Sequence, residues 1–380
     1  MDFELSEQLV AARSKARDFA LREMTPELAR KFDSEEAYPD ELRKKAFASG
    51  IVDYSDPWKM LVAMEEFCRV DAGTGISALA SLFGIELIML FGNDEQKQKY
   101  LPAVNSGEAI MGMAVTEPAA GSDVAGIKTR ATKSGDKYVI SGSKMFITNG
   151  QVADFLVMLT RTSPAGEKRH HGLSVFIVDL NSPGVTRNKL HGKLGVRATN
   201  TAEIILDNVQ VPASNLLGEE GKGFYYIMTF FNISRIYVAI QGVAIAQGAF
   251  DRTLELFDKN KRVIDETERE QVLLTLGEMA TRIEAARLLT YKAASYLFQF
   301  NPDPKLTSMA KAFAAETAVF VTEKALELTG VEGMAGDLER SFRDAKIMEI
   351  WEGTSEVEKL VIARTIARDR RKAREVKVVA

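Results

Sequence analysis

The sequence has few of the residues that build disulfide-rich or metal-binding proteins. Cys68 is the only cysteine among 380 residues, which excludes an internal disulfide, a Cys-based zinc finger and a redox pair. The three histidines are His170 and His171, neighbours in a polar stretch, and His191, which is isolated. None has the helical i, i+4 spacing of a zinc pair. We therefore expect no metal site.

An excess of positive charge is also absent. The formal net charge is -4 and the pI is about 5.7, so nothing favours nucleic acid as a partner. The one basic run, residues 368–377, follows a helical pattern, where cations stabilise a helix end.

Long apolar runs are missing as well. The most apolar stretch, residues 76–91, is at the short end of membrane-spanning length and is interrupted by Glu86, so it predicts a buried core helix. The first residues are acidic and mixed, unlike a signal peptide. Together with the single cysteine, these features predict a cytoplasmic protein without a membrane span.

The sequence divides into three regions, and their patterns together predict an α+β multidomain fold. Residues 1–112 carry apolar residues at three- and four-residue spacing and predict an N-terminal α-helical domain. Residues 113–219 contain short β-rich runs between turns and predict a middle antiparallel β domain, a sandwich or barrel. Residues 220–380 carry long helical patterns and predict a C-terminal four-helix bundle. The expected strands are 138–140, 145–148, 155–159, 173–178 and 204–206, and the expected long helices are 224–258, 267–298 and 305–328.

Two common functional motifs do not apply to this sequence. Residues 73–78 (Gly-Thr-Gly-Ile-Ser-Ala) match the dinucleotide fingerprint, but that fingerprint must follow a strand, and here it follows a helical pattern. No G-x-S-x-G elbow is present, so nothing supports a serine hydrolase.

The segment around Glu352 is a better candidate for chemistry. Ser355 and Glu358 form an S-x-x-E pattern that predicts a capping box and a helix start at Ser355. Glu352 would then lie in a short link where Gly353 frees the backbone. The preceding residues 350–351 (Ile-Trp) would desolvate the carboxylate and raise its pKa toward that of a general base. From this segment alone, an exposed loop acid is an equally good interpretation.

A second segment, residues 114–123 (Ala-Val-Thr-Glu-Pro-Ala-Ala-Gly-Ser-Asp), combines small residues with hydroxyl groups. Small residues let the backbone approach a ligand closely, and Thr116 and Ser122 add hydrogen-bond donors. Taken alone, the segment is better explained as an ordinary Pro/Gly turn leading into a sheet.

Together these segments resemble the acyl-CoA dehydrogenase family, from about residue 92 to residue 364. The resemblance runs in the family's order through the stretches 92–102, 115–123, 140–150, 221–224, 343–347 and 352–355. It implies an α-helical domain, a β domain and a four-helix bundle, the same order as the pattern above.

The resemblance also implies a reaction. FAD would lie between the β domain and the bundle, and an acyl-CoA would bind beside it. Glu352 would remove the α-proton while the β-hydride passes to the flavin, which gives a 2-enoyl-CoA. A flavin ribityl hydroxyl and the Glu352 N–H would bind the thioester carbonyl. Some relatives carry the base at the position of Ser234, so a serine there leaves Glu352 as the base. An electron-transfer flavoprotein would be the electron acceptor.

Matching positions imply individual roles. The implied cofactor contacts are Met113, Val115, Thr116, Phe146, Thr148, Thr354 and Glu356. The implied substrate contacts are Ser122, Arg235 and Gly353. Ile76, Leu79 and Phe83 would line the acyl end of the pocket or else face the general core. If they line it, they favour a short to medium aliphatic or alicyclic acyl group over a dicarboxylate.

The part of the FAD site that a neighbouring subunit supplies departs from the family. Residues 260–264 (Asn-Lys-Arg-Val-Ile) stand where homotetrameric relatives have Arg-x-x-Phe-Gly. Residues 327–331 (Glu-Leu-Thr-Gly-Val) stand where relatives have Gln followed by Gly-Gly, so an acid would face phosphates. This suggests a heteromer in which a related subunit completes the FAD site, and a homotetramer in which Lys261 or Arg262 binds the phosphates is an equally good interpretation.

Two further alternatives rank lower. A non-catalytic subunit typically loses the base, and this chain keeps Glu352. An acyl-CoA oxidase is usually much longer.

Overall fold

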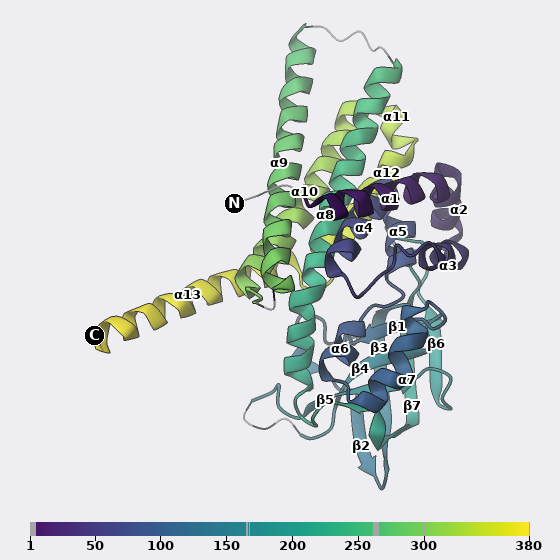
Figure 1. The fold of residues 1–380 in the computed structure, drawn as a ribbon, viewed down its shortest axis with the longest axis vertical. Helices are drawn as coiled ribbons and strands as arrows, with labels where there is room; N and C mark the ends of the chain where they lie inside the picture. The colour runs from purple at the N-terminus through teal and green to yellow at the C-terminus, as the bar shows by residue number, and fades with distance from the viewer. Residues whose placement is uncertain (1–4, 165, 167, 261–265, 300, 380) are drawn as a thin grey trace.

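Along the chain, a β-sheet region lies between two helical regions. In Figure 1, helices from both ends of the chain pack together in the upper part and the sheet lies in the lower part. The computed structural model describes residues 5–379 except 165, 167, 261–265 and 300. The N-terminal helices are α1 (Glu7–Glu23), α2 (Pro26–Glu35), α3 (Asp40–Ala48), α4 (Pro57–Val70), α5 (Ala72–Leu79), α6 (Ile85–Phe91) and α7 (Asp94–Asn105). Capping residues in the sequence determine where several of these helices begin. Thr25 and Asp56 are the N-caps of α2 and α4, and each of these helices begins with a proline. Asn93 forms a capping box with Gln96 at the start of α7.

The apolar stretch 76–91 is not one helix, as the sequence suggested, but parts of α5 and α6. The chain breaks between them at Gly84, whose φ of 98° favours glycine. The match to the dinucleotide fingerprint lies on α5, directly after a helix. Its second glycine, Gly75, has a packing role, because a Cβ there would lie 2.9 Å from the backbone of Phe67 on α4.

The middle region is one eight-stranded sheet in the order β6-β7-β3-β2-β4-β5-β8, with β1 paired to β4. Its strands are β1 (Met111–Ala114), β2 (Arg130–Ser134), β3 (Lys137–Thr148), β4 (Phe155–Arg161), β5 (Leu173–Asp179), β6 (Val185–Lys189), β7 (Thr201–Pro212) and β8 (Leu216–Leu217). The pairs are antiparallel except β1–β4 and β2–β4, which are parallel. The strands expected at 138–140 and 145–148 are not separate. The chain continues from one to the other through residues 141–143 as β3, with a bulge against β7 after Ile140.

The C-terminal region is a helical bundle. Its helices are α8 (Gly223–Asn260), α9 (Glu266–Phe298), α10 (Pro304–Thr329), α11 (Val331–Met334), α12 (Asp337–Ala345) and α13 (Ser355–Val379), and the 3-10 helices of the chain are η1 (Val124–Gly126), η2 (Ala213–Asn215) and η3 (Lys346–Glu349). In the described part of the chain, α8 is the one helix long and apolar enough to cross a membrane, but 67% of its most apolar window is buried. A core helix has this property. Helix α13 extends away from the body of the molecule (Figure 1).

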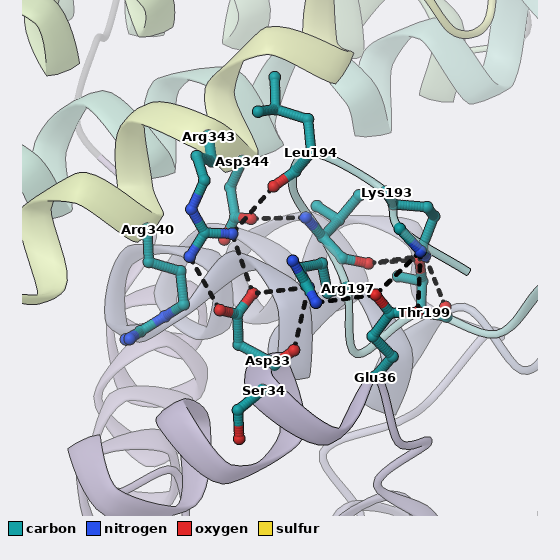
Figure 2. A network of polar contacts seen from close by, with 12 residues as sticks. Asp33, Ser34, Glu36, Lys193, Leu194, Arg197, Thr199, Arg340, Arg343 and Asp344 are labelled. Atoms are coloured by element: carbon teal, nitrogen blue, oxygen red, sulfur yellow. Dashed lines mark hydrogen bonds and ion pairs between the residues drawn. The ribbon is translucent and has the colours of Figure 1, made fainter. Parts of the chain in front are cut away.

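A polar network joins the three regions (Figure 2). Arg343 on α12 donates to both carboxylate oxygens of Asp33 at the end of α2, at 3.1 and 2.8 Å. It also donates to the carbonyl of Leu194, in the loop between β6 and β7, at 2.9 Å. The neighbouring Asp344 accepts from Val196 N in the same loop at 2.5 Å. The C-terminal end of α12, which precedes the segment that carries Glu352, is therefore anchored to both other regions.

Candidate active site

Glu352 lies in the link between η3 and α13, with a left-handed φ of 51°. Helix α13 starts at Ser355, but the predicted capping box is wrong. Thr354 is the cap, because its hydroxyl accepts from Val357 N at 3.3 Å. Ser355 Oγ has no hydrogen-bond partner within the described residues, and Glu358 faces Arg235 instead.

The carboxylate of Glu352 is half-buried and held by one strong hydrogen bond. Ser234 Oγ on α8 donates to its Oε2 at 2.5 Å. Burial raises the pKa of Glu352, while the Ser234 hydrogen bond and the charges of Arg235 and Lys311 act in the opposite direction. Ile350 does not contribute to this burial as the sequence suggested, because its side chain is 52% exposed.

Two buried cations hold the backbone beside the base. Arg235 Nε on α8 donates to the carbonyl of Glu352 at 3.1 Å and lies 3.0 Å from the carboxylate of Glu358. Lys311 on α10 is fully buried and donates to the carbonyl of Gly353 at 2.5 Å. Desolvation lowers the pKa of Lys311 to about 8. Arg235, which the resemblance assigns to substrate, is thus placed at the base's own backbone.

Gly353 is required by this geometry. Its φ is +104°, and a Cβ would lie 2.1 Å from Glu358 Oε1. Lys311 and Glu358 were not among the predicted site residues. The sequence around Lys311 does not indicate its role, because Lys311 reaches the link that carries Glu352 only through the packing of α10 against that link.

On the sheet side, Phe146 stands out. Its φ is 60°, it lies where the register of β3 and β7 shifts, and its ring is 67% exposed. Thr116 is adjacent, since its carbonyl accepts from Met145 N at 2.9 Å. The side chain of Thr148, at the end of β3, is half-buried. The structure therefore brings the predicted positions 116 and 146–148 into one region of the sheet.

The other predicted contacts are placed differently. The side chains of Met113 and Val115 are buried in the apolar core shared with α6, so neither side chain is exposed to a ligand. Ser122 is exposed in the loop before η1, and Glu356 is exposed in the first turn of α13. Thr354 is half-buried beside Glu352.

A buried ion pair that the sequence did not single out supports the loop at 115–117. Lys144 on β3 is fully buried and donates to Val115 O at 3.0 Å and to Glu117 Oε1 at 2.9 Å. Glu117 also accepts from the backbone N–H groups of Lys128 and Thr129, at 2.6 and 2.9 Å. Burial lowers the pKa of Lys144 to about 8, and Glu117 opposes that shift.

Comparison with known proteins identifies the family. Three family models match: the N-terminal, middle and C-terminal domains of acyl-CoA dehydrogenase, at residues 6–108, 112–209 and 221–367. The short-chain specific acyl-CoA dehydrogenase of Clostridium acetobutylicum is 40% identical over 384 residues, covering 97% of this chain and all of the relative.

The chain belongs to the acyl-CoA dehydrogenase family. The butyryl-CoA dehydrogenase structure from Megasphaera elsdenii superposes with a TM-score of 0.91 at 33% identity, covering 97% of this chain and all of that one. The subunit CarC of the caffeyl-CoA reductase-Etf complex of Acetobacterium woodii is 36% identical, covering 94% and 98%. As a member of this family, the chain is an oxidoreductase that acts on acyl-CoA and has the family's three-domain fold.

Two stretches of this acyl-CoA dehydrogenase, 260–264 and 327–331, bear on how a neighbouring subunit would complete the FAD site. The carboxylate of Glu327 is ion-paired with Lys324 at 2.6 Å. Val331, at the start of α11, is 83% exposed. Residues 261–264 lie outside the described part of the chain.

Proposed function

We propose that the chain is an FAD-dependent dehydrogenase that converts an acyl-CoA to the 2-enoyl-CoA, with Glu352 as the base. One observation carries the proposal: a carboxylate with a pKa raised by burial sits on a left-handed link whose two carbonyls are fixed by Arg235 and Lys311. A base needs a carboxylate of sufficient basicity in a fixed position; burial raises the pKa of Glu352, and Arg235 and Lys311 fix the backbone beside it.

The residues of the chain have separable tasks. Glu352 takes the α-proton, and the hydroxyl of Ser234 keeps its carboxylate in place before the proton moves. The backbone N–H of Glu352 donates to no backbone or side-chain acceptor within the described residues. It is therefore free to stabilise the negative charge that develops on a thioester carbonyl.

The residues around the base fit an FAD. Trp351 Nε1 and Ser355 Oγ are buried without a hydrogen-bond partner in the described part of the chain, which is expected where a polar ligand completes a site. The exposed ring of Phe146 and the hydroxyl groups of Thr116 and Thr148 would hold the flavin from the sheet side. A bound FAD would accept the hydride that leaves the β-carbon.

Replacing Glu352 by Gln tests the base. The change keeps size and hydrogen bonding but removes the proton acceptor, so we expect anaerobic flavin reduction by acyl-CoA thioesters to slow by ~10²–10⁴-fold. Binding of FAD and acyl-CoA should persist, as measured by flavin absorbance. Reduction within tenfold of the parent rate would eliminate Glu352 as the base.

An electron-transfer flavoprotein is the proposed electron acceptor, and the similarity to a subunit of an Etf complex supports this choice. Turnover should then require an added electron acceptor. Steady turnover with oxygen alone would instead identify an acyl-CoA oxidase. We propose a cytoplasmic location for the reaction.

We further propose that a neighbouring subunit completes the FAD site and that this neighbour is an unlike, related chain. The basis is the departure of residues 260–264 and 327–331 from the homotetrameric pattern. The ion pair with Lys324 offsets the negative charge of Glu327 that would repel the FAD phosphates. The remaining obstacle to the homotetramer is steric, because the exposed Val331 would crowd these phosphates. Purification of the chain alone tests the idea. A homotetramer with one tightly held FAD per subunit would overturn it.

A further inference from the structure

Glu86 is a shielded carboxyl group in the first turn of α6, inside an otherwise apolar stretch. Its Oε2 is inaccessible to solvent and has no hydrogen-bond partner in the described part of the chain. Burial, together with the nearby charge of Glu352, raises the pKa of Glu86 to about 7. The unpaired oxygen therefore lies within electrostatic range of the base.

Helix α8 places Glu86 relative to the base. The rings of Phe83 and Phe230 meet edge to face, with centroids 5.3 Å apart. Ser234, which binds Glu352, lies one turn beyond Phe230 on α8, and Tyr237 follows at the next turn on the same face. Burial and the charge of Glu86 both raise the pKa of Tyr237.

Tyr54, in the loop before α4, supplies a third polar group. Burial and the charges of Glu86 and Tyr237 raise its pKa. Within the described residues, neither tyrosine hydroxyl makes a hydrogen bond, and both side chains are half-buried. Glu86 thus interacts electrostatically with Glu352 and with both tyrosines. Among these groups, Glu86 Oε2 is buried without a hydrogen-bond partner in the described part of the chain, although buried polar groups are normally hydrogen-bonded.

We propose that Glu86, Tyr54 and Tyr237 form a polar subsite of the acyl pocket that recognises a neutral hydrogen-bonding group, such as a hydroxyl, on the acyl chain. The inference rests on the proposed dehydrogenation and names its substrate class. Burial favours the protonated form of the Glu86 carboxyl group, and a protonated carboxyl group both donates and accepts hydrogen bonds. An ionised carboxylate on the acyl chain would instead be repelled by Glu352 and Glu86.

A matched series of five-carbon thioesters tests this proposal: pentanoyl-CoA, 5-hydroxypentanoyl-CoA and glutaryl-CoA, which end in methyl, hydroxymethyl and carboxylate. We expect kcat/KM for the hydroxylated substrate to equal or exceed that for pentanoyl-CoA, with glutaryl-CoA the poorest. Replacing Glu86 by Leu should lower the hydroxylated-to-plain ratio at least tenfold, because the hydroxyl loses its partner. Glu86→Gln should retain most of the ratio.

Met89→Gln, at an exposed position of α6, is the matched control and should leave the ratio at the parent value. A Glu86→Leu enzyme whose ratio changes less than tenfold would overturn the subsite. Failure of every thioester to reduce the flavin would instead refute the proposed function. In that case, binding of the same thioesters to Glu352→Gln, with and without Glu86→Leu, decides the subsite by flavin absorbance.

Discussion

Removing the hydroxyl of Ser234 should weaken the base at acidic pH. Ser234 is 4% exposed and donates to Glu352 at 2.5 Å, so water cannot readily replace it. A hydrogen bond to a charged group contributes about 1.5 kcal/mol or more, which corresponds to roughly tenfold in an equilibrium constant. The hydrogen bond stabilises the ionised carboxylate and lowers its pKa. Its loss therefore raises the pKa of Glu352, and the ionised fraction at acidic pH falls about tenfold.

The assay is the rate of anaerobic flavin reduction by a saturating acyl-CoA, measured by stopped flow from acidic to alkaline pH. For Ser234→Ala we expect the acidic limb of the profile to move to higher pH, and the alkaline plateau to change less. Thr229→Ala is the control, since Thr229 is exposed on the same helix and bonds only within it, to Tyr225 O at 3.0 Å. An acidic limb at the parent position in Ser234→Ala would refute the assigned role of this hydrogen bond.

Two further substitutions test the supports of the site. Gly353→Ala should cost about 1–3 kcal/mol in the free energy of unfolding and slow flavin reduction, because φ is +104° and the new Cβ would meet Glu358. Unchanged thermal unfolding and reduction rates would contradict this. Lys144→Met should cost about 3–5 kcal/mol in urea unfolding, because it leaves the carboxylate of Glu117 buried without its counter-charge. The double variant with Glu117→Gln should be less destabilised, and equal losses would count against the ion-pair explanation.

The sequence predicted the long elements well, because their signals are local and repeated. The patterns at 224–258, 267–298 and 305–328 correspond to α8, α9 and α10 to within two residues at each end. The predictions failed where the same local sequence is compatible with two different backbone structures. The Ser-Gly-Ser at 141–143 is typical of a turn, but it forms a bulge because β7 pairs along both sides of it.

At the candidate site, sequence motifs indicated positions but not their surroundings. Thr354 rather than Ser355 caps α13, because the backbone conformation at Gly353 determines which hydroxyl reaches the next turn. The partners of Glu352 come from α8 and α10, and no local pattern encodes such distant packing. Glu86 could be seen only as an interruption of an apolar stretch. Ile76 and Leu79, considered for the acyl pocket, lie in the core of the helical regions, which favours the alternative.

The network of Figure 2 has a consequence for the order of folding. Arg343 and Asp33 are 310 positions apart, and Ser234 and Glu352 are 118 apart. Contacts between such distant positions form late, because a long loop must close first. During synthesis, the N-terminal helices and the sheet emerge well before α12 and the link that bears Glu352. We therefore expect the emerging chain to gain its base only when almost all of it has been translated, so that a prematurely terminated chain is inactive.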